Sequence, residues 1–178
     1  MIRLARHGQT AYNAIGRFQG RLPVPLDETG REQARALAEA CAPMGFASLW
    51  CSPLARARET ADVVAARLGL EPREDPRWAE TDAGDWTDRL FADVIAEDAD
   101  AFARFAAVDP GFAFPGGESF REHQERVATA VAELRARPAD HPALVVCHGV
   151  TIRLALLAAR GDDRARTMPL PNTALVEL

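Results

Sequence analysis

Two histidines stand directly before a glycine, in Arg6-His7-Gly8 and in Cys147-His148-Gly149, and Arg56 and Glu80 lie between these motifs. An imidazole nitrogen can attack phosphorus, and guanidinium groups bind phosphate oxygens in pairs. A carboxyl group can protonate the alcohol that leaves. This set of side chains therefore predicts phosphoryl transfer, with His7 as the residue that becomes phosphorylated.

Three predicted strands position the basic residues. Apolar segments over residues 2–5, 46–51 and 143–147 have the length and composition of buried strands. In open α/β sheets, ligands bind at the carboxyl ends of the strands. We expect the basic residues that follow the three segments to meet at this edge of the sheet. These residues are Arg6, His7, Arg56 and His148.

Helical patterns alternate with the strands. Apolar spacing predicts helices over residues 29–42, 52–68, 119–137 and 151–159, two short helices between 88 and 108, and a closing strand over 173–178. Ser119 and Glu122 form a capping box, as do Thr29 and Glu32. Ser52 before Pro53 has the features of a helix start.

This alternation predicts the α/β class, with a three-layer, mostly parallel, doubly wound sheet flanked by helices. A length of 178 residues fits one domain over residues 1–178. Within it, residues 87–120 form a helical insertion beside the site. Residues 16–25, rich in glycine, proline and arginine, form a loop over it.

Composition narrows the class of protein. The net charge of −5 argues against a nucleic-acid partner or a membrane partner. All 21 basic residues are arginines, so no lysine is available for a Schiff base or a Walker A loop. Three widely spaced cysteines, Cys41, Cys51 and Cys147, indicate a reducing compartment. With neither a signal peptide nor a membrane-length apolar run, we expect a cytoplasmic enzyme.

Six blocks in this order resemble the histidine phosphatase superfamily, the phosphoglycerate-mutase-like enzymes. The blocks are Arg6-His7-Gly8-Gln9-Thr10, Ser52-Pro53-Leu54-Ala55-Arg56, Glu80 with Trp86, Gly116-Gly117-Glu118-Ser119, Cys147-His148-Gly149 with Arg153, and Leu170-Pro171-Asn172-Thr173. The resemblance covers nearly the whole chain. It implies the fold of that family and catalysis through a phosphohistidine, without metal or other cofactor.

The resemblance also implies roles for individual residues. His7 matches the phosphorylated histidine and Glu80 the acid/base carboxylate. The remaining matches are Arg6, Arg56 and His148 to the positive phosphate pocket, Asn13 and Gln19 to loop positions at the phosphate, and Thr10 and Gly149 to residues that shape the pocket. Pro23, Asp27 and Thr87-Asp88 depart from the family pattern, and they lie on the substrate side.

Several alternatives stay open. Asp82 could supply the proton instead of Glu80. Cys147 and Arg153 satisfy the C-x5-R pattern of cysteine-dependent phosphatases, and a thiolate at a helix start is physically sensible. A non-catalytic phosphate-binding module is a further possibility. Metal binding is disfavoured, because no H-x-x-x-H or H-E-x-x-H spacing occurs and arginines repel cations.

Within the family, the reaction could be hydrolysis or a mutase-type transfer. Mutases of the family are longer and usually carry Glu-Arg-His-Tyr-Gly after the acid/base region, where this chain has Glu80-Thr-Asp-Ala-Gly. We therefore expect a phosphomonoester hydrolase acting on a small phosphorylated metabolite, similar to the alpha-ribazole phosphatase-type or broad-specificity members. It would be a monomer or a homodimer.

Other side chains are given no catalytic role. His123 and His141 are predicted to lie at the surface, on a polar helix and in a turn before a strand. Trp78 and Trp86 are expected to pack within a lid. The phenylalanines between Phe91 and Phe120 could form a core or an apolar wall over the substrate.

Overall fold

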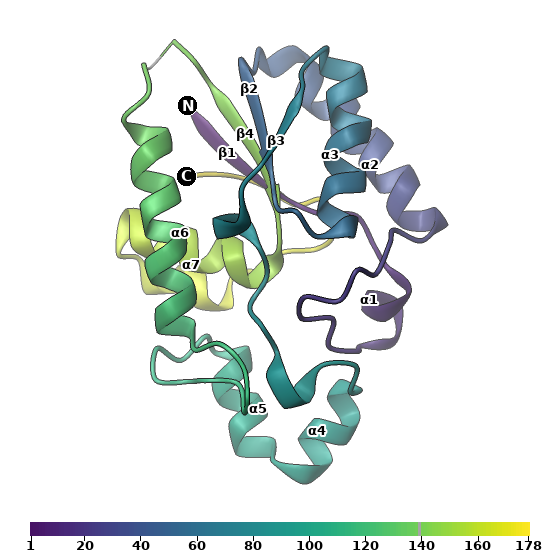
Figure 1. The fold of residues 1–178 in the computed structure, drawn as a ribbon, viewed down its shortest axis with the longest axis vertical. Helices are drawn as coiled ribbons and strands as arrows, with labels where there is room; N and C mark the ends of the chain where they lie inside the picture. Colours follow the sequence, from purple (N-terminus) through teal and green to yellow (C-terminus); the bar gives the residue numbers. More distant parts are fainter. Residues whose placement is uncertain (139) are drawn as a thin grey trace.

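A five-stranded sheet forms the centre of the computed structural model, which describes residues 1–138 and 140–178 (Figure 1). The strand order is β3-β2-β4-β1-β5. The strands are β1 (Ile2–Arg6), β2 (Ser48–Cys51), β3 (Pro72–Glu74), β4 (Ala143–Cys147) and β5 (Leu175–Glu177). All neighbouring pairs are parallel except β1 and β5. The predicted mostly parallel α/β sheet is confirmed.

Helices cover both faces of this sheet (Figure 1). α2 (Glu28–Cys41) and α3 (Ala55–Leu68) pack together on one face, and α6 (Phe120–Arg135) and α7 (Gly149–Arg160) on the other. Because side chains alternate along a strand, Val145 of β4 faces the α6–α7 core while its neighbours Leu144 and Val146 face the α2–α3 core. Two apolar cores thereby fix the sheet between two helical layers.

Short helices lie beyond the carboxyl ends of the strands (Figure 1). α4 (Phe91–Glu97) and α5 (Ala99–Ala106) are the two short helices predicted in this part of the chain. α1 (Ala11–Ile15) was not predicted. It begins at Thr10, whose side chain forms a capping box with Asn13. The 3-10 turns are Ala42–Met44, Pro76–Trp78, Gly84–Trp86 and Asp163–Thr167.

Two predicted helix starts are wrong. α2 is capped by Asp27, whose side chain accepts the Gly30 amide, and Thr29 lies inside the first turn. α3 begins after Leu54, which lies in extended conformation. Ser52 instead accepts the Leu54 amide at 3.2 Å. Ser119 does form the predicted capping box at the start of α6.

The edge strand β3 was also missed. It has three residues and begins with Pro72, a residue that edge strands tolerate because one side of their backbone needs no ladder partner. Along the described residues, 1–138 and 140–178, no helix is both long and apolar enough to cross a membrane.

Candidate active site

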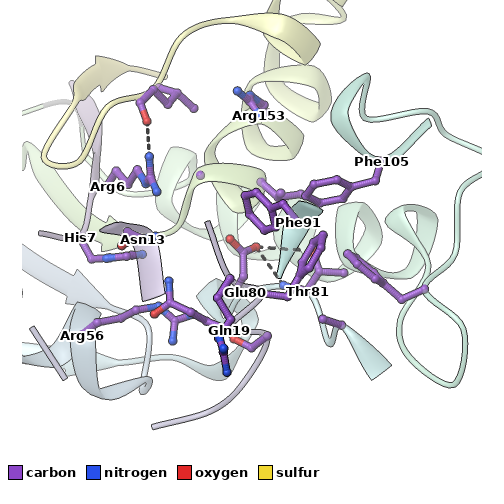
Figure 2. A pocket seen from close by; sticks show the side chains of 18 of the residues that line it. Arg6, His7, Asn13, Gln19, Arg56, Glu80, Thr81, Phe91, Phe105 and Arg153 are labelled. Carbon is purple, nitrogen blue, oxygen red and sulfur yellow. Dashed lines mark hydrogen bonds between the residues drawn. The ribbon is translucent and has the colours of Figure 1, made fainter. Parts of the chain in front are cut away.

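A cavity of about 340 Å³ opens at the carboxyl ends of β1 and β4 (Figure 2). Predicted site residues from five segments of the chain line it together. They are Arg6, His7, Asn13, Gln19, Arg56, Glu80 and Gly149. The structure therefore brings most of the predicted residues to one place. The two others, Thr10 and His148, lie fully buried behind the cavity wall.

His7 is fixed in one orientation at the end of β1. Its amide donates to the Cys147 carbonyl at 3.0 Å. Its ring Nδ1 lies 2.7 Å from the Gly8 carbonyl oxygen, which can only accept, so Nδ1 carries the proton. Nε2 is then the basic nitrogen. Burial, with Arg56 and Arg6 nearby, lowers the pKa of His7 well below its usual value, which keeps the ring neutral.

Two arginines at the cavity are held by backbone carbonyls rather than carboxylates. Arg56 is buried and donates to the carbonyls of Leu22 and Gly20 at 3.1 and 2.9 Å. Arg6 donates to the Leu170 carbonyl at 2.5 Å. Burial lowers the pKa of Arg56 to about 10, so it is charged at neutral pH.

His148 packs against His7, with 5.1 Å between the ring centroids. Its Nε2 lies 2.7 Å from the Ser52 hydroxyl. The same hydroxyl accepts the Leu54 amide at 3.2 Å. Nδ1 of His148 is buried and has no partner among the described residues. Burial lowers the pKa of His148 well below its usual value, followed by the effect of Arg56.

The loop after β1 is built by backbone contact. A Cβ on Gly30 would lie 2.0 Å from the Gln9 carbonyl oxygen, and a Cβ on Gly8 would lie 2.4 Å from the Gly30 carbonyl oxygen. The Gly8 amide also donates to Thr60 on α3 at 3.1 Å. α2 and α3 therefore both contact Gly8, the residue next to His7.

Amide side chains surround the other side of the loop. Thr10 donates to Gln19 at 2.9 Å, and Asn13 accepts from both Thr10 and Asn172. Asn172 also donates to the His7 carbonyl at 3.1 Å. Thr10 thus orients the predicted phosphate-side residues Asn13 and Gln19 without lining the cavity itself.

Glu80 is the one acidic side chain that lines this cavity among the described residues. Its Oε1 accepts the Thr81 amide at 2.9 Å. Asp82 does not line the cavity, and its side chain accepts the Gly84 amide at 3.0 Å. The loop carrying both residues contacts a second loop closely, because a Cβ on Gly84 would lie 2.2 Å from the Pro115 carbonyl oxygen. The geometry favours Glu80 over Asp82 as the proton donor.

An apolar wall faces these charged groups. Phe91 and Phe105 project from α4 and α5 into the cavity near Glu80 (Figure 2). Phe18 and Phe114 line the same wall and pack against Phe105, with ring centroids 5.1 and 5.5 Å away. Phe102, Phe112 and Phe120 pack behind them. The phenylalanines thus form both a core and a cavity wall, the two alternatives left open by the sequence.

The sequence profile of the histidine phosphatase superfamily (branch 1) matches residues 2–178. The chain belongs to this superfamily. It is 32% identical to phosphoserine phosphatase 1 of Hydrogenobacter thermophilus over 163 residues, which are 92% of this chain and 77% of that protein. It is 33% identical over 153 residues to a probable phosphoglycerate mutase of an Enterobacter species, covering 85% and 70% of the two chains.

Solved structures of histidine phosphatases share the fold. A mycobacterial glucosyl-3-phosphoglycerate phosphatase in complex with VO3 is 33% identical, with a TM-score of 0.90 over 98% of this chain and 90% of that chain. A putative alpha-ribazole-5'-P phosphatase from Escherichia coli is 32% identical, with a TM-score of 0.75 over 87% and 77% of the two chains. The resemblance predicted from the motifs is confirmed.

The cysteine alternative does not fit this histidine phosphatase. Cys147 is the last residue of β4, fully buried, and it does not line the cavity. Burial raises the pKa of its thiol far above the usual value. A neutral, inaccessible thiol cannot act as the nucleophile. Cys41, Cys51 and Cys147 are all buried free thiols. No cluster of three or more histidine, cysteine or acidic side chains suited to a metal occurs among the described residues.

Three residues at the site were not given their place by sequence reasoning. Arg153 lines the cavity and donates to the Met168 carbonyl at 3.0 Å. The resemblance included Arg153, four residues after Gly149, but gave it no role at the site. Arg17 lines the cavity and pairs with Asp88 at 2.9 Å. His123, predicted at the surface, is fully buried beside Thr81, so that prediction is wrong.

Proposed function

We propose that this histidine phosphatase hydrolyses the phosphomonoester of a small metabolite through a phosphohistidine at His7. One observation carries the proposal. The Nδ1 atom of a neutral His7 is held by the Gly8 carbonyl. The ring lines a cavity with three arginines, Arg6, Arg56 and Arg153, that contact carbonyls and have no carboxylate partner among the described residues. A basic Nε2 beside free guanidinium groups suits attack on a phosphate dianion.

The reaction then proceeds in two steps. In the first, Nε2 of His7 bonds to phosphorus, the ester P–O bond breaks, and Glu80 gives its proton to the leaving oxygen. In the second, Glu80 removes a proton from water, whose oxygen bonds to phosphorus as the P–N bond breaks. Arg6 and Arg56 bind the phosphate oxygens throughout. His148, which packs against His7, would complete the phosphate site with Asn13, Gln19 and the backbone of Gly149.

The substrate's alcohol would lie against the apolar wall. Phe91 and Phe105 belong to that wall and lie on the same side of the cavity as Glu80 (Figure 2), where the leaving oxygen must be. This placement favours an ester whose alcohol has an apolar or aromatic portion close to the phosphate.

We also propose that residues 1–178 form a single domain, with residues 87–120 as its substrate-side insertion. We further propose that the protein acts in the reducing cytoplasm, which the three free thiols support.

A trapped phosphoenzyme tests this function. We expect rapid quenching in alkaline detergent during turnover of a 32P-labelled phosphomonoester to leave an acid-labile, base-stable label on the protein. His7→Ala should abolish the label, whereas His141→Ala, at an exposed histidine outside the cavity, should retain it. Absence of label in the folded wild-type chain would contradict the proposal, as would a label that survives in His7→Ala.

A mutase-type transfer is the second candidate, because a relative at 33% identity is named a probable phosphoglycerate mutase. Incubation with 3-phosphoglycerate and, separately, with p-nitrophenyl phosphate distinguishes the two reactions. Hydrolysis predicts phosphate release from p-nitrophenyl phosphate without isomerisation of 3-phosphoglycerate. Rapid isomerisation would favour the mutase.

A further inference from the structure

A buried histidine lies directly behind the loop that carries Glu80. His123 is on α6, one turn after its capping residue, and it has no exposed surface. Its Nδ1 lies 2.7 Å from the Thr81 hydroxyl oxygen. Its Nε2 is buried and has no partner among the described residues. An apolar side chain here would avoid the cost of burying an imidazole, so the contact with Thr81 is what the histidine contributes.

Thr81 connects this histidine to the carboxylate. Oε1 of Glu80 accepts the Thr81 amide at 2.9 Å, and the Thr81 and Thr151 hydroxyls lie 3.5 and 3.4 Å from the same oxygen. Oε2 makes no such contact with the described residues. One carboxylate oxygen is therefore held by the protein, and the other is left for the substrate's leaving oxygen and for water.

The hydrogen atoms can be assigned along this chain of contacts. A buried N–H without a partner is rarer in proteins than a buried acceptor without one, so the proton of His123 belongs on Nδ1. Nδ1 then donates to Thr81, and the Thr81 hydroxyl hydrogen points to Glu80. Burial, with Arg126 and Arg21 nearby, lowers the pKa of His123 well below its usual value, so the ring stays neutral and adds no charge beside the carboxylate.

We propose that His123 is a positioning residue for Glu80, acting through Thr81 to aim the free carboxylate oxygen at the leaving group. This inference rests on the proposed function, because it assumes that Glu80 protonates the leaving oxygen. A shift of about 1 Å in a reacting group can cost about a hundredfold in rate. The network fixes Oε1 on a short loop where the backbone alone would allow the side chain to turn.

The test compares two esters that share a nitroaromatic ring and differ in how much protonation the leaving group needs. p-Nitrophenyl phosphate leaves as a stable phenolate and needs little protonation, whereas p-nitrobenzyl phosphate leaves as an alkoxide and needs the acid. We expect His123→Leu to lower kcat/KM for the benzyl ester about tenfold more than for the phenyl ester. kcat/KM reports only steps up to the formation of phosphohistidine, so the hydrolytic step does not mask the difference.

Matched variants separate positioning from packing. His123→Asn keeps an N–H donor near the place of Nδ1 and should restore most of the benzyl-ester activity. Val127→Ala, on the same buried face of α6 one turn further on, should reduce stability while changing both esters equally. Thr81→Val combined with His123→Leu should lose no more than either single variant, because both remove the same link.

The results distinguish this inference from the function beneath it. Glu80→Gln must itself affect the benzyl ester more than the phenyl ester; equal losses would overturn the assignment of the acid. If Glu80→Gln shows the selective loss and folded His123→Leu loses both esters equally, the positioning role is wrong while the function stands. A selective loss that His123→Asn does not rescue would also count against the proposed donor.

Discussion

Arg56 is a buried cation without a carboxylate partner among the described residues. Its side chain is fully enclosed, yet its partners are two neutral carbonyls, Gly20 and Leu22, and Nε has no partner among the described residues. Burying a charge without a counter-charge is costly, and burial accordingly lowers its pKa. A phosphate dianion in the cavity would supply the missing charge, so ligand binding and the stability of the site are coupled.

Replacing this arginine should weaken anion binding. We expect Arg56→Ala to raise the inhibition constants for phosphate and vanadate by at least about tenfold, since a hydrogen bond to a charged group contributes about 1.5–3 kcal/mol. Arg58→Ala is the matched control, because Arg58 lies two residues further on α3, is half-exposed outside the cavity, and pairs with Asp62 and Glu74.

The measurement is steady-state inhibition of p-nitrophenyl phosphate hydrolysis, with circular dichroism to verify folding. Should Arg56→Ala fail to fold, Arg56→Lys keeps the charge but loses the paired carbonyl contacts, and it should weaken vanadate inhibition less. Unchanged inhibition in a folded Arg56 variant would remove this residue from the phosphate site.

The sequence predicted the positions of the site residues that follow strands. It did not predict the burial of His123, which lies on a helix. His7, Arg6 and Arg56 follow apolar segments, and parallel strands bring their carboxyl ends together whatever the details of the helices. His123 follows a capping box in a mostly polar stretch, so its helical position gave no sign of burial. Its depth is set by the contact of α6 with the Thr81 loop, which is separated from it in sequence.

The start of α2 was also predicted wrongly, because a contact distant in sequence determines which residue caps the helix. The Thr29–Glu32 spacing fits a capping box, yet Asp27 caps the helix because Gly30 must contact the Gln9 backbone. That contact requires the helix to begin early enough to bring Gly30 into its first turn. Asp27 also accepts from the Gln9 side chain at 3.1 Å, so the cap and the loop after β1 are joined.

Replacing each candidate cap by alanine in turn tests whether Asp27 or Thr29 caps α2. Asp27→Ala should lower the free energy of unfolding by about 1 kcal/mol or more, the usual cost of losing a helix cap, because the Gly30 amide loses its partner. Thr29→Ala, at an exposed position inside the first turn, should change stability by less than about 0.5 kcal/mol.

Urea unfolding monitored by circular dichroism measures both variants. A larger loss in Thr29→Ala than in Asp27→Ala would restore Thr29 as the cap.

Elements with a strong apolar period, such as β4 and α6, were predicted with nearly correct bounds. β3 and α1 are short, and they exist because a neighbouring strand or a capping side chain provides their partners.

For the whole molecule, three of the four histidines are buried and neutral. Burial is the main cause of the lowered pKa at His7, His123 and His148. In the unfolded chain these rings regain the ordinary value of about 6.5. Below that pH the unfolded state therefore binds more protons than the folded state, and stability must fall as pH falls.

The expected effect is a decline in the free energy of unfolding between about pH 6.5 and 5, with a slope of up to about 1.4 kcal/mol per pH unit for each histidine. His123→Asn, which cannot titrate, should remove about a third of that slope. Urea unfolding at several pH values measures it. A constant or rising stability on acidification would show that these histidines are accessible to protons in the folded state.

The loop after β1 is closed by residues from the far end of the sequence. Leu170 accepts from Arg6, the Thr173 amide and Asn172 donate to the His7 carbonyl, and Ala174 accepts the Arg6 amide. During synthesis His7 is added long before these partners. The environment of His7 is therefore complete only after residues 170–174 have been added, and a nascent chain that stops before them lacks the finished loop.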